Sequence, residues 1–223
     1  MATFDLEQQE QLDAIKSVWE RWGNLVTWLL IIVLGAYAAW NGWNYWQRRQ
    51  GTLASTLYGE LERSADAGDV AHTERIFSDM KDHYGRTTYA TYAALLAAKT
   101  LYDKSKAAEA EAALTWAADK GADPGLRAIA RLRLASLDIG QKAYDKALKT
   151  LSADFPPQFR ALAADRRGDV LLLQGKRKEA AAEYSRAYQT MDPAAGEYRR
   201  LIGIKLNALG INPDAGAKVG GAA

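Results

Sequence analysis

The longest run of mostly hydrophobic positions covers residues 25–46, and no charged residue lies within it. A helix of that length extends over roughly 33 Å at about 1.5 Å per residue, which is enough to cross a hydrocarbon core of about 30 Å. A buried helix of a soluble domain rarely needs so long an uncharged run. The pattern therefore predicts a single transmembrane helix over residues 23–47.

Tryptophans gather at both ends of this run, and two arginines follow it. Tryptophan prefers the headgroup interface, where its ring is half buried and its N–H stays hydrated. Arginine ends the apolar run because its charge is excluded from the hydrocarbon. The residues expected at the membrane interface are Trp19, Trp22, Trp40, Trp43, Trp46, Arg48 and Arg49.

A cleaved secretion signal is the alternative for this segment, because Ala36–Ala38 fits the small-x-small cleavage pattern. Two features oppose it. The apolar run continues to Trp46, and residues 1–22 form a short acidic segment, whereas signal peptides begin short and basic. We therefore expect an anchor that is not removed.

Beyond Arg49, apolar positions recur at helical spacing in segments of about 11 to 18 residues that are separated by short breaks. The small residues Ala110, Ala147 and Ala180 lie 37 and 33 positions apart, near the period of about 34 that tetratricopeptide repeats show. The breaks fall at 68–69, 84–86, 104–105, 121–125, 141–142, 155–157, 175–176 and 192–193.

This periodicity predicts an all-α fold: one N-terminal transmembrane helix, then a tetratricopeptide-like solenoid of helix pairs over residues 50–213. The first pair is degenerate, because Thr73 stands where the pattern favours a smaller residue. A last helix over residues 195–209 would cap the open stack. Residues 214–223 are rich in glycine and alanine and are expected to form a flexible tail.

Composition excludes several classes of function. A formal net charge of +2 gives no electrostatic reason to expect nucleic-acid binding. With no cysteine, the chain has no disulfide, thiolate metal site or cysteine nucleophile. His72 and His83 would stand about 16 Å apart on one helix, too far to share a metal ion. Asp79 and His83 are better read as a surface ion pair than as two ligands.

No nucleophile elbow, phosphate loop or zinc signature is present, so no catalytic residue, metal, cofactor or small-molecule substrate is expected. A stack of helix pairs instead offers a concave surface lined by the first helix of each pair. On this register Leu132 and Ser136 belong to that surface. The candidates for binding a polypeptide partner are Tyr92, Leu95, Lys99, Tyr102, Asp165 and Asp169. The alternative places Tyr92 and Leu95 in the core.

The order of parts resembles the ancillary SecYEG translocon subunits, the YfgM-like tetratricopeptide proteins of Gram-negative inner membranes. The resemblance covers nearly the whole chain. Its most specific element is Ala164-Asp165-Arg166-Arg167-Gly168-Asp169, which a generic tetratricopeptide unit does not require. The other matching segments are 11–16, 43–46, 132–135, 147–151 and 205–209.

The resemblance implies a protein of the inner membrane with a cytoplasmic N-terminus and a periplasmic repeat domain. It implies association with the SecYEG channel and with a membrane-anchored periplasmic chaperone of the PpiD type. The protein would help pass newly translocated chains to periplasmic folding factors, and it would have no catalytic residues.

Two other functions fit the same fold: an envelope assembly or cell-division scaffold, and a regulatory adaptor that faces the cytoplasm. The positive-inside rule does not decide the orientation, because Lys16 and Arg21 before the span balance Arg48 and Arg49 after it.

Overall fold

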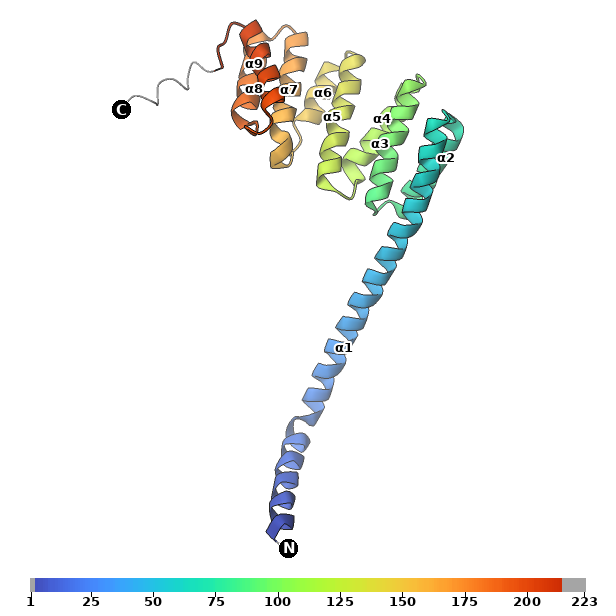
Figure 1. The fold of residues 1–223 in the computed structure, drawn as a ribbon, viewed down its shortest axis with the longest axis vertical. Coiled ribbons are helices and arrows are strands. Elements are labelled where there is room, and N and C mark those ends of the chain that lie inside the picture. The colour runs from blue at the N-terminus through green and yellow to red at the C-terminus, as the bar shows by residue number, and fades with distance from the viewer. Residues whose placement is uncertain (1–2, 214–223) are drawn as a thin grey trace, which may run out of the picture. The chain divides into compact units, whose positions relative to one another are not determined.

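The computed structural model describes residues 3–213, and in the first helix it describes side chains at residues 16, 19 and 20 and from 22 onwards. The chain divides into two compact units, Met1–Gln50 and Gly51–Ala223. Within the described residues there are nine α-helices and no strand (Figure 1), as the sequence predicts. The predicted tail at 214–223 lies outside the described residues, as do most side chains of the acidic segment.

Helix α1 runs over Thr3–Asp66 and carries the long apolar run. Within Trp22–Asp66 it is long and apolar enough to cross a membrane by length and composition. A core helix of a soluble protein would bury such a stretch, yet Ile32 is 64% exposed and Trp40 67% exposed. The helix does not end after the apolar run. Residues 47–53 contain no proline, and the single Gly51 does not interrupt the helix.

The second unit is a row of antiparallel helix pairs. The end of α1 forms the first pair with α2, and three further pairs follow, with α9 last (Figure 1). Every connection coincides with a break that the sequence predicts. The helices are α2 Val70–Tyr84, α3 Thr88–Asp103, α4 Ala107–Lys120, α5 Pro124–Gly140, α6 Tyr144–Leu151, α7 Pro157–Leu173, α8 Arg177–Thr190 and α9 Gly196–Ala208.

The turn inside each pair has the same backbone conformation in all four pairs. Gly68, Ser105, Lys142 and Gly175 have φ values of 66°, 63°, 60° and 77°. After each of them, the next residue donates its N–H to the carbonyl five positions earlier, as Lys106 does to Leu101 at 2.9 Å. This left-handed residue ends the first helix and reverses the chain. The four pairs therefore share one turn geometry, and Ser105 and Lys142 adopt it where the other two pairs have glycine.

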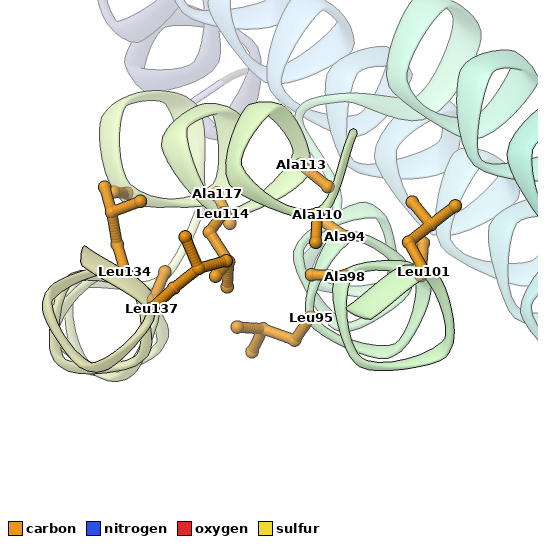
Figure 2. Close-up of a cluster of buried hydrophobic side chains, with 13 residues drawn as sticks. Ala94, Leu95, Ala98, Leu101, Ala110, Ala113, Leu114, Ala117, Leu134 and Leu137 are labelled. Atoms are coloured by element: carbon orange, nitrogen blue, oxygen red, sulfur yellow. The ribbon is translucent and has the colours of Figure 1, made fainter. Parts of the chain in front are cut away.

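Small residues allow the two helices of a pair to approach closely. Ala110, Ala147 and Ala180 are fully buried, and Thr73 is fully buried at the corresponding position of the first pair. The Thr73 hydroxyl lies 3.0 Å from Ser64 Oγ, so the buried hydroxyl of the degenerate pair has a hydrogen-bond partner on the neighbouring helix. Figure 2 shows the core where α3, α4 and α5 meet, built from alanines and from a few leucines.

Candidate functional site: a groove along the first helices

A pocket of about 280 Å³ opens between α3 and α5, the first helices of the second and third pairs. Its floor is apolar because leucines of the core in Figure 2 form it, and its rim carries a tyrosine and two cations. The lining residues are Leu95, Ala98, Lys99, Tyr102, Leu114, Arg133, Ser136 and Leu137.

A second pocket of about 260 Å³ lies between α5 and α7, and its lining extends to α9. Arg133 and Ser136 line both pockets, so the two are neighbouring parts of one groove along the first helices. We call their combined lining the groove. The second pocket is lined by Ile129, Leu132, Arg133, Ser136, Phe159, Leu162, Arg166 and Tyr198.

Three of the predicted partner-binding residues line the groove: Leu95, Lys99 and Tyr102. Leu95 is 6% exposed and belongs both to the core and to the pocket floor. Tyr92 lies outside the two pockets and is 43% exposed, with its ring centroid 6.2 Å from that of Tyr58 on α1. Partner binding by these residues stays a prediction.

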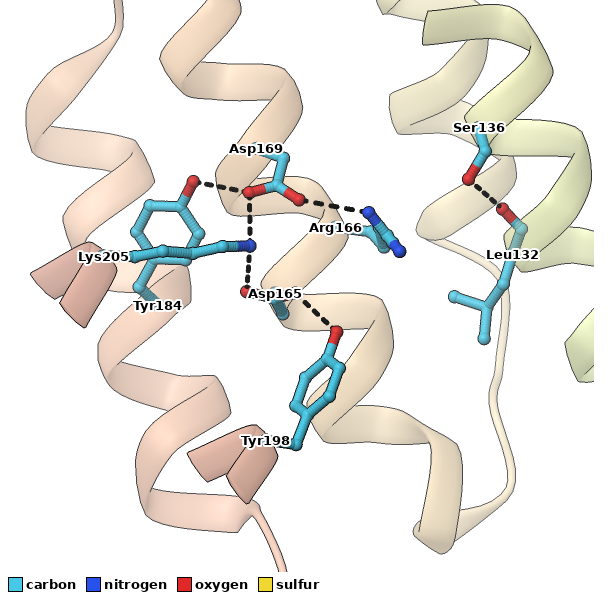
Figure 3. A network of polar contacts seen from close by, with 8 residues as sticks. All are labelled: Leu132, Ser136, Asp165, Arg166, Asp169, Tyr184, Tyr198 and Lys205. Carbon is cyan, nitrogen blue, oxygen red and sulfur yellow. Dashed lines mark hydrogen bonds and ion pairs between the residues drawn. The ribbon is translucent and has the colours of Figure 1, made fainter. Parts of the chain in front are cut away.

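Asp165 does not lie on the groove surface, which corrects its expected place. Its side chain is 1% exposed, because α9 packs on α7 and covers it. The Tyr198 hydroxyl donates to Oδ2 of Asp165 at 2.8 Å, and Lys205 Nζ lies 2.7 Å from Oδ1 (Figure 3). Both oxygens are thus engaged by residues of the last helix, and a partner has no access to the carboxylate.

Asp169 completes the same network and is also occupied. Its Oδ1 accepts from the Tyr184 hydroxyl at 2.7 Å and from Lys205 Nζ at 2.6 Å, while Arg166 lies 3.4 Å from Oδ2 (Figure 3). We call Asp165, Asp169, Tyr184, Tyr198 and Lys205 the latch. It joins α7, α8 and α9 through side chains.

The latch tyrosines remain protonated donors. Burial, followed by the hydrogen bond to Asp169, raises the pKa of Tyr184 far above its ordinary value. Burial and the hydrogen bond to Asp165 act in the same direction on the pKa of Tyr198. Both hydroxyls therefore donate to the carboxylates throughout the physiological range, so the latch is a structural device.

Sequence reasoning missed Arg133, Arg166 and Tyr198. The repeat period could have found the two arginines, because they lie 33 positions apart, the same interval as Ala147 and Ala180. Each occupies the same place on the first helix of its pair. Tyr198 gave no such signal, since it reaches the groove from the last helix, α9.

The predicted interface residues of the anchor lie along α1 with their side chains exposed. The exposed fractions of the five tryptophans range from 43% at Trp46 to 67% at Trp40, and the ring centroids of Trp43 and Trp46 lie 5.4 Å apart. Trp19 and Trp22 are exposed, as are Arg48 and Arg49. Their position relative to a bilayer stays an expectation.

The histidines show no ligand arrangement in the described part of the chain. No cluster of three potential metal ligands occurs among those residues. The expected ion pair of Asp79 and His83 is absent there too: His83 instead places its ring 6.4 Å from that of Tyr84. His72 Nδ1 lies 3.0 Å from an Arg75 guanidinium nitrogen.

Known proteins match this chain over nearly its whole length. A protein of Neisseria gonorrhoeae named ancillary SecYEG translocon subunit is 29% identical over 205 residues, which cover 92% of this chain and 98% of that protein. The protein of the same name from Escherichia coli is 27% identical over 208 residues, covering 92% and 97%. That of Aggregatibacter actinomycetemcomitans is 26% identical over 206 residues, covering 92% and 99%.

These similarities confirm the resemblance seen in the sequence. With the apolar helix α1, they support a membrane-anchored protein. The model of the tetratricopeptide repeat-like domain matches residues 16–211, which include the end of α1, all four pairs and α9. The chain therefore belongs to the tetratricopeptide repeat-like domain family.

Proposed function

We propose that this protein is a membrane-anchored scaffold of the SecYEG translocon, which binds channel and chaperone partners and helps hand newly translocated proteins to periplasmic chaperones. The observation that carries the proposal is the groove: two joined apolar pockets with a cationic rim, open to a polypeptide. The printed names of the relatives support the translocon as its location.

The mechanism is tethering. Anchoring by α1 confines the repeat domain to the membrane surface, so the groove meets emerging chains and channel partners at a raised effective concentration. Exposed aromatic side chains such as Tyr92 and Tyr102 supply contact area at low entropic cost. Each step is association or release, and none requires a bond to be made or broken.

The proposed orientation has the N-terminus in the cytoplasm and the repeat domain in the periplasm. Protease added to spheroplasts tests it directly. A periplasmic domain is digested from outside, and a fragment containing the anchor remains in the membrane. Full protection of the repeat domain until the membrane is lysed would overturn the orientation and favour the cytoplasmic adaptor.

Purification of the full-length protein in mild detergent, followed by mass spectrometry, tests the partners. We expect channel subunits and a PpiD-type chaperone to be recovered. Tyr102→Ala removes an aromatic from the groove rim and is expected to reduce chaperone recovery. Tyr89→Ala is the matched control, because Tyr89 is an exposed tyrosine on the same helix that lines neither pocket. Recovery of wall-synthesis proteins in place of channel subunits would favour the envelope assembly or cell-division scaffold.

A further inference from the structure

Arg133 occupies the junction of the two pockets, and no carboxylate among the described side chains forms an ion pair with it. It is exposed, and its guanidinium donates to the Leu95 carbonyl at 3.4 Å. Over residues 22–213, no carboxylate lies within ion-pair distance of it. An arginine at the centre of an apolar groove is therefore available to an external acceptor.

The other charged residues of the groove lining have the same sign as Arg133 but differ in their local pairing. Lys99 lies 2.8 Å from Asp103 on its own helix, and Arg166 lies 3.4 Å from Asp169. The two outer cations are thus partly neutralised, and the central one is not. The positive potential of the groove is therefore focused at Arg133, where a negative group of a ligand is favoured.

An apolar pocket lies on each side of Arg133. Leu114 and Leu137 line the first, and Phe159 and Leu162 line the second. Each pocket lies between two neighbouring first helices, and helices in contact are about 8–10 Å apart. An extended polypeptide advances about 3.3 Å per residue, so it reaches from one pocket to the next in roughly three residues.

We propose that the groove selects extended polypeptide segments in which an acidic residue lies between two apolar residues about three positions apart. The acidic side chain accepts hydrogen bonds from Arg133, and the apolar side chains enter the two pockets. This inference deepens the proposed function and rests on it, since it names the feature that a bound chain must present.

Fluorescence anisotropy of labelled peptides with the full-length protein in detergent micelles tests the selection. Three peptides share serine–glycine flanks and differ at one position of the core: leucine–serine–glutamate–leucine, the same core with glutamine, and the same core with lysine. We expect the glutamate peptide to bind up to about fivefold more tightly than the glutamine peptide, as an exposed ion pair allows. The lysine peptide should bind most weakly.

Reversing the charge of Arg133 is the decisive part of the test. Arg133→Glu should reverse the order, so that the lysine peptide binds more tightly than the glutamate peptide. Lys178→Glu, on the exposed face of α8, makes the same change of net charge and should leave the order of the parent protein unchanged. Circular dichroism of each variant shows whether the helices are retained.

Equal binding of the three peptides by the parent protein, or the same order in Arg133→Glu as in the parent, would overturn the inference. Recovery of channel subunits by the parent protein is measured separately. If that recovery persists while the peptide order fails, the scaffold function stands without the acidic preference. If no channel subunit is recovered, the proposed function itself fails.

Discussion

Lys205 on α9 lies 2.7 Å from Asp165 Oδ1 on α7, 40 positions earlier in the chain. The position that Asp165 occupies in its pair is apolar in the two preceding pairs. Leu132 and Leu95 precede Asp165 by one and two repeats on the same face of their first helices. The carboxylate is therefore a feature of the last pair, whose first helix is covered by α9.

Lys205→Met is expected to destabilise the last pair by about 3–5 kcal/mol, because it leaves the buried Asp165 without its cation. Urea unfolding followed by circular dichroism measures the change, and hydrogen exchange locates it at α7–α9. Lys99→Met is the matched control: its pair with Asp103 is exposed and worth at most about 1 kcal/mol. Equal effects of the two substitutions would contradict a structural role for the latch.

Gly168→Ala is expected to cost about 1–3 kcal/mol through overpacking. A Cβ at this position would lie 2.6 Å from ring atoms of Tyr184, closer than real contacts allow, so α7 and α8 must separate. Thermal unfolding measures the loss.

Gly196→Ala is the control for Gly168→Ala, since a Cβ there meets no atom within 4 Å, and it should be neutral or slightly stabilising. Combining Gly168→Ala with Tyr184→Leu should cost less than the sum of the single changes. Strict additivity would show that the ring is not the obstacle.

Asp138 on α5 predicts a pH dependence. Burial raises its pKa above the ordinary 3.8, and the nearby Lys146 partly opposes that rise. Between the two values the folded state holds a proton that the unfolded state has released, so this group's contribution to stability falls as the pH rises through that window. Above the raised pKa, Asp138 is ionised in both the folded and the unfolded state, so the destabilisation that it causes no longer changes with pH.

Asp138→Asn removes the titrating carboxyl and with it this pH-dependent contribution to stability. The stability of the variant relative to the parent should therefore increase as the pH rises from about 3.8, near the ordinary Asp pKa, toward neutral. Urea unfolding at a series of pH values measures the difference. Lys146 also pairs with Glu111, so Glu111→Gln is measured alongside to separate that carboxylate's titration. A difference that does not change with pH would refute an elevated pKa at Asp138.

The anchor is expected to remain on the mature protein. Membranes washed with alkaline carbonate should retain the full-length chain, and its intact mass should include the residues before Ala38. Ile32→Arg places a charge near the middle of the apolar run, at an insertion cost of about 2.5–3.5 kcal/mol, and should release part of the protein. Tyr89→Arg, a surface change on α3, is the control and should leave membrane retention unchanged. A soluble chain trimmed after Ala38 would disprove the anchor.

The sequence alone predicted the helices and their order, because local signals mark each break. Glycine or a polar residue stands at every left-handed turn, as at Gly175 and Ser105, and the small buried residues mark the period. The continuity of α1 beyond residue 47 was not predicted, because a change from apolar to charged residues marks the end of a membrane segment without ending a helix.

The candidate site was predicted only in part, because some of its contacts join residues that are far apart along the chain. Leu95, Lys99 and Tyr102 follow from the register of one helix. The burial of Asp165 depends on Lys205 and Tyr198, which lie 40 and 33 positions later and carry no repeat signal. Sequence periodicity treats all pairs as equivalent, whereas the last pair differs because a capping helix covers it.

The latch has a consequence for how this array can evolve in length. Repeat proteins commonly grow by duplication of a pair, since each pair contacts only its neighbours. A pair inserted between α8 and α9 would carry Lys205 away from Asp165 and Asp169, and would strand both carboxylates against a new apolar neighbour. We therefore expect an added pair to destabilise the array more at the C-terminal junction than between the earlier pairs, because only there does it separate Lys205 from its carboxylates.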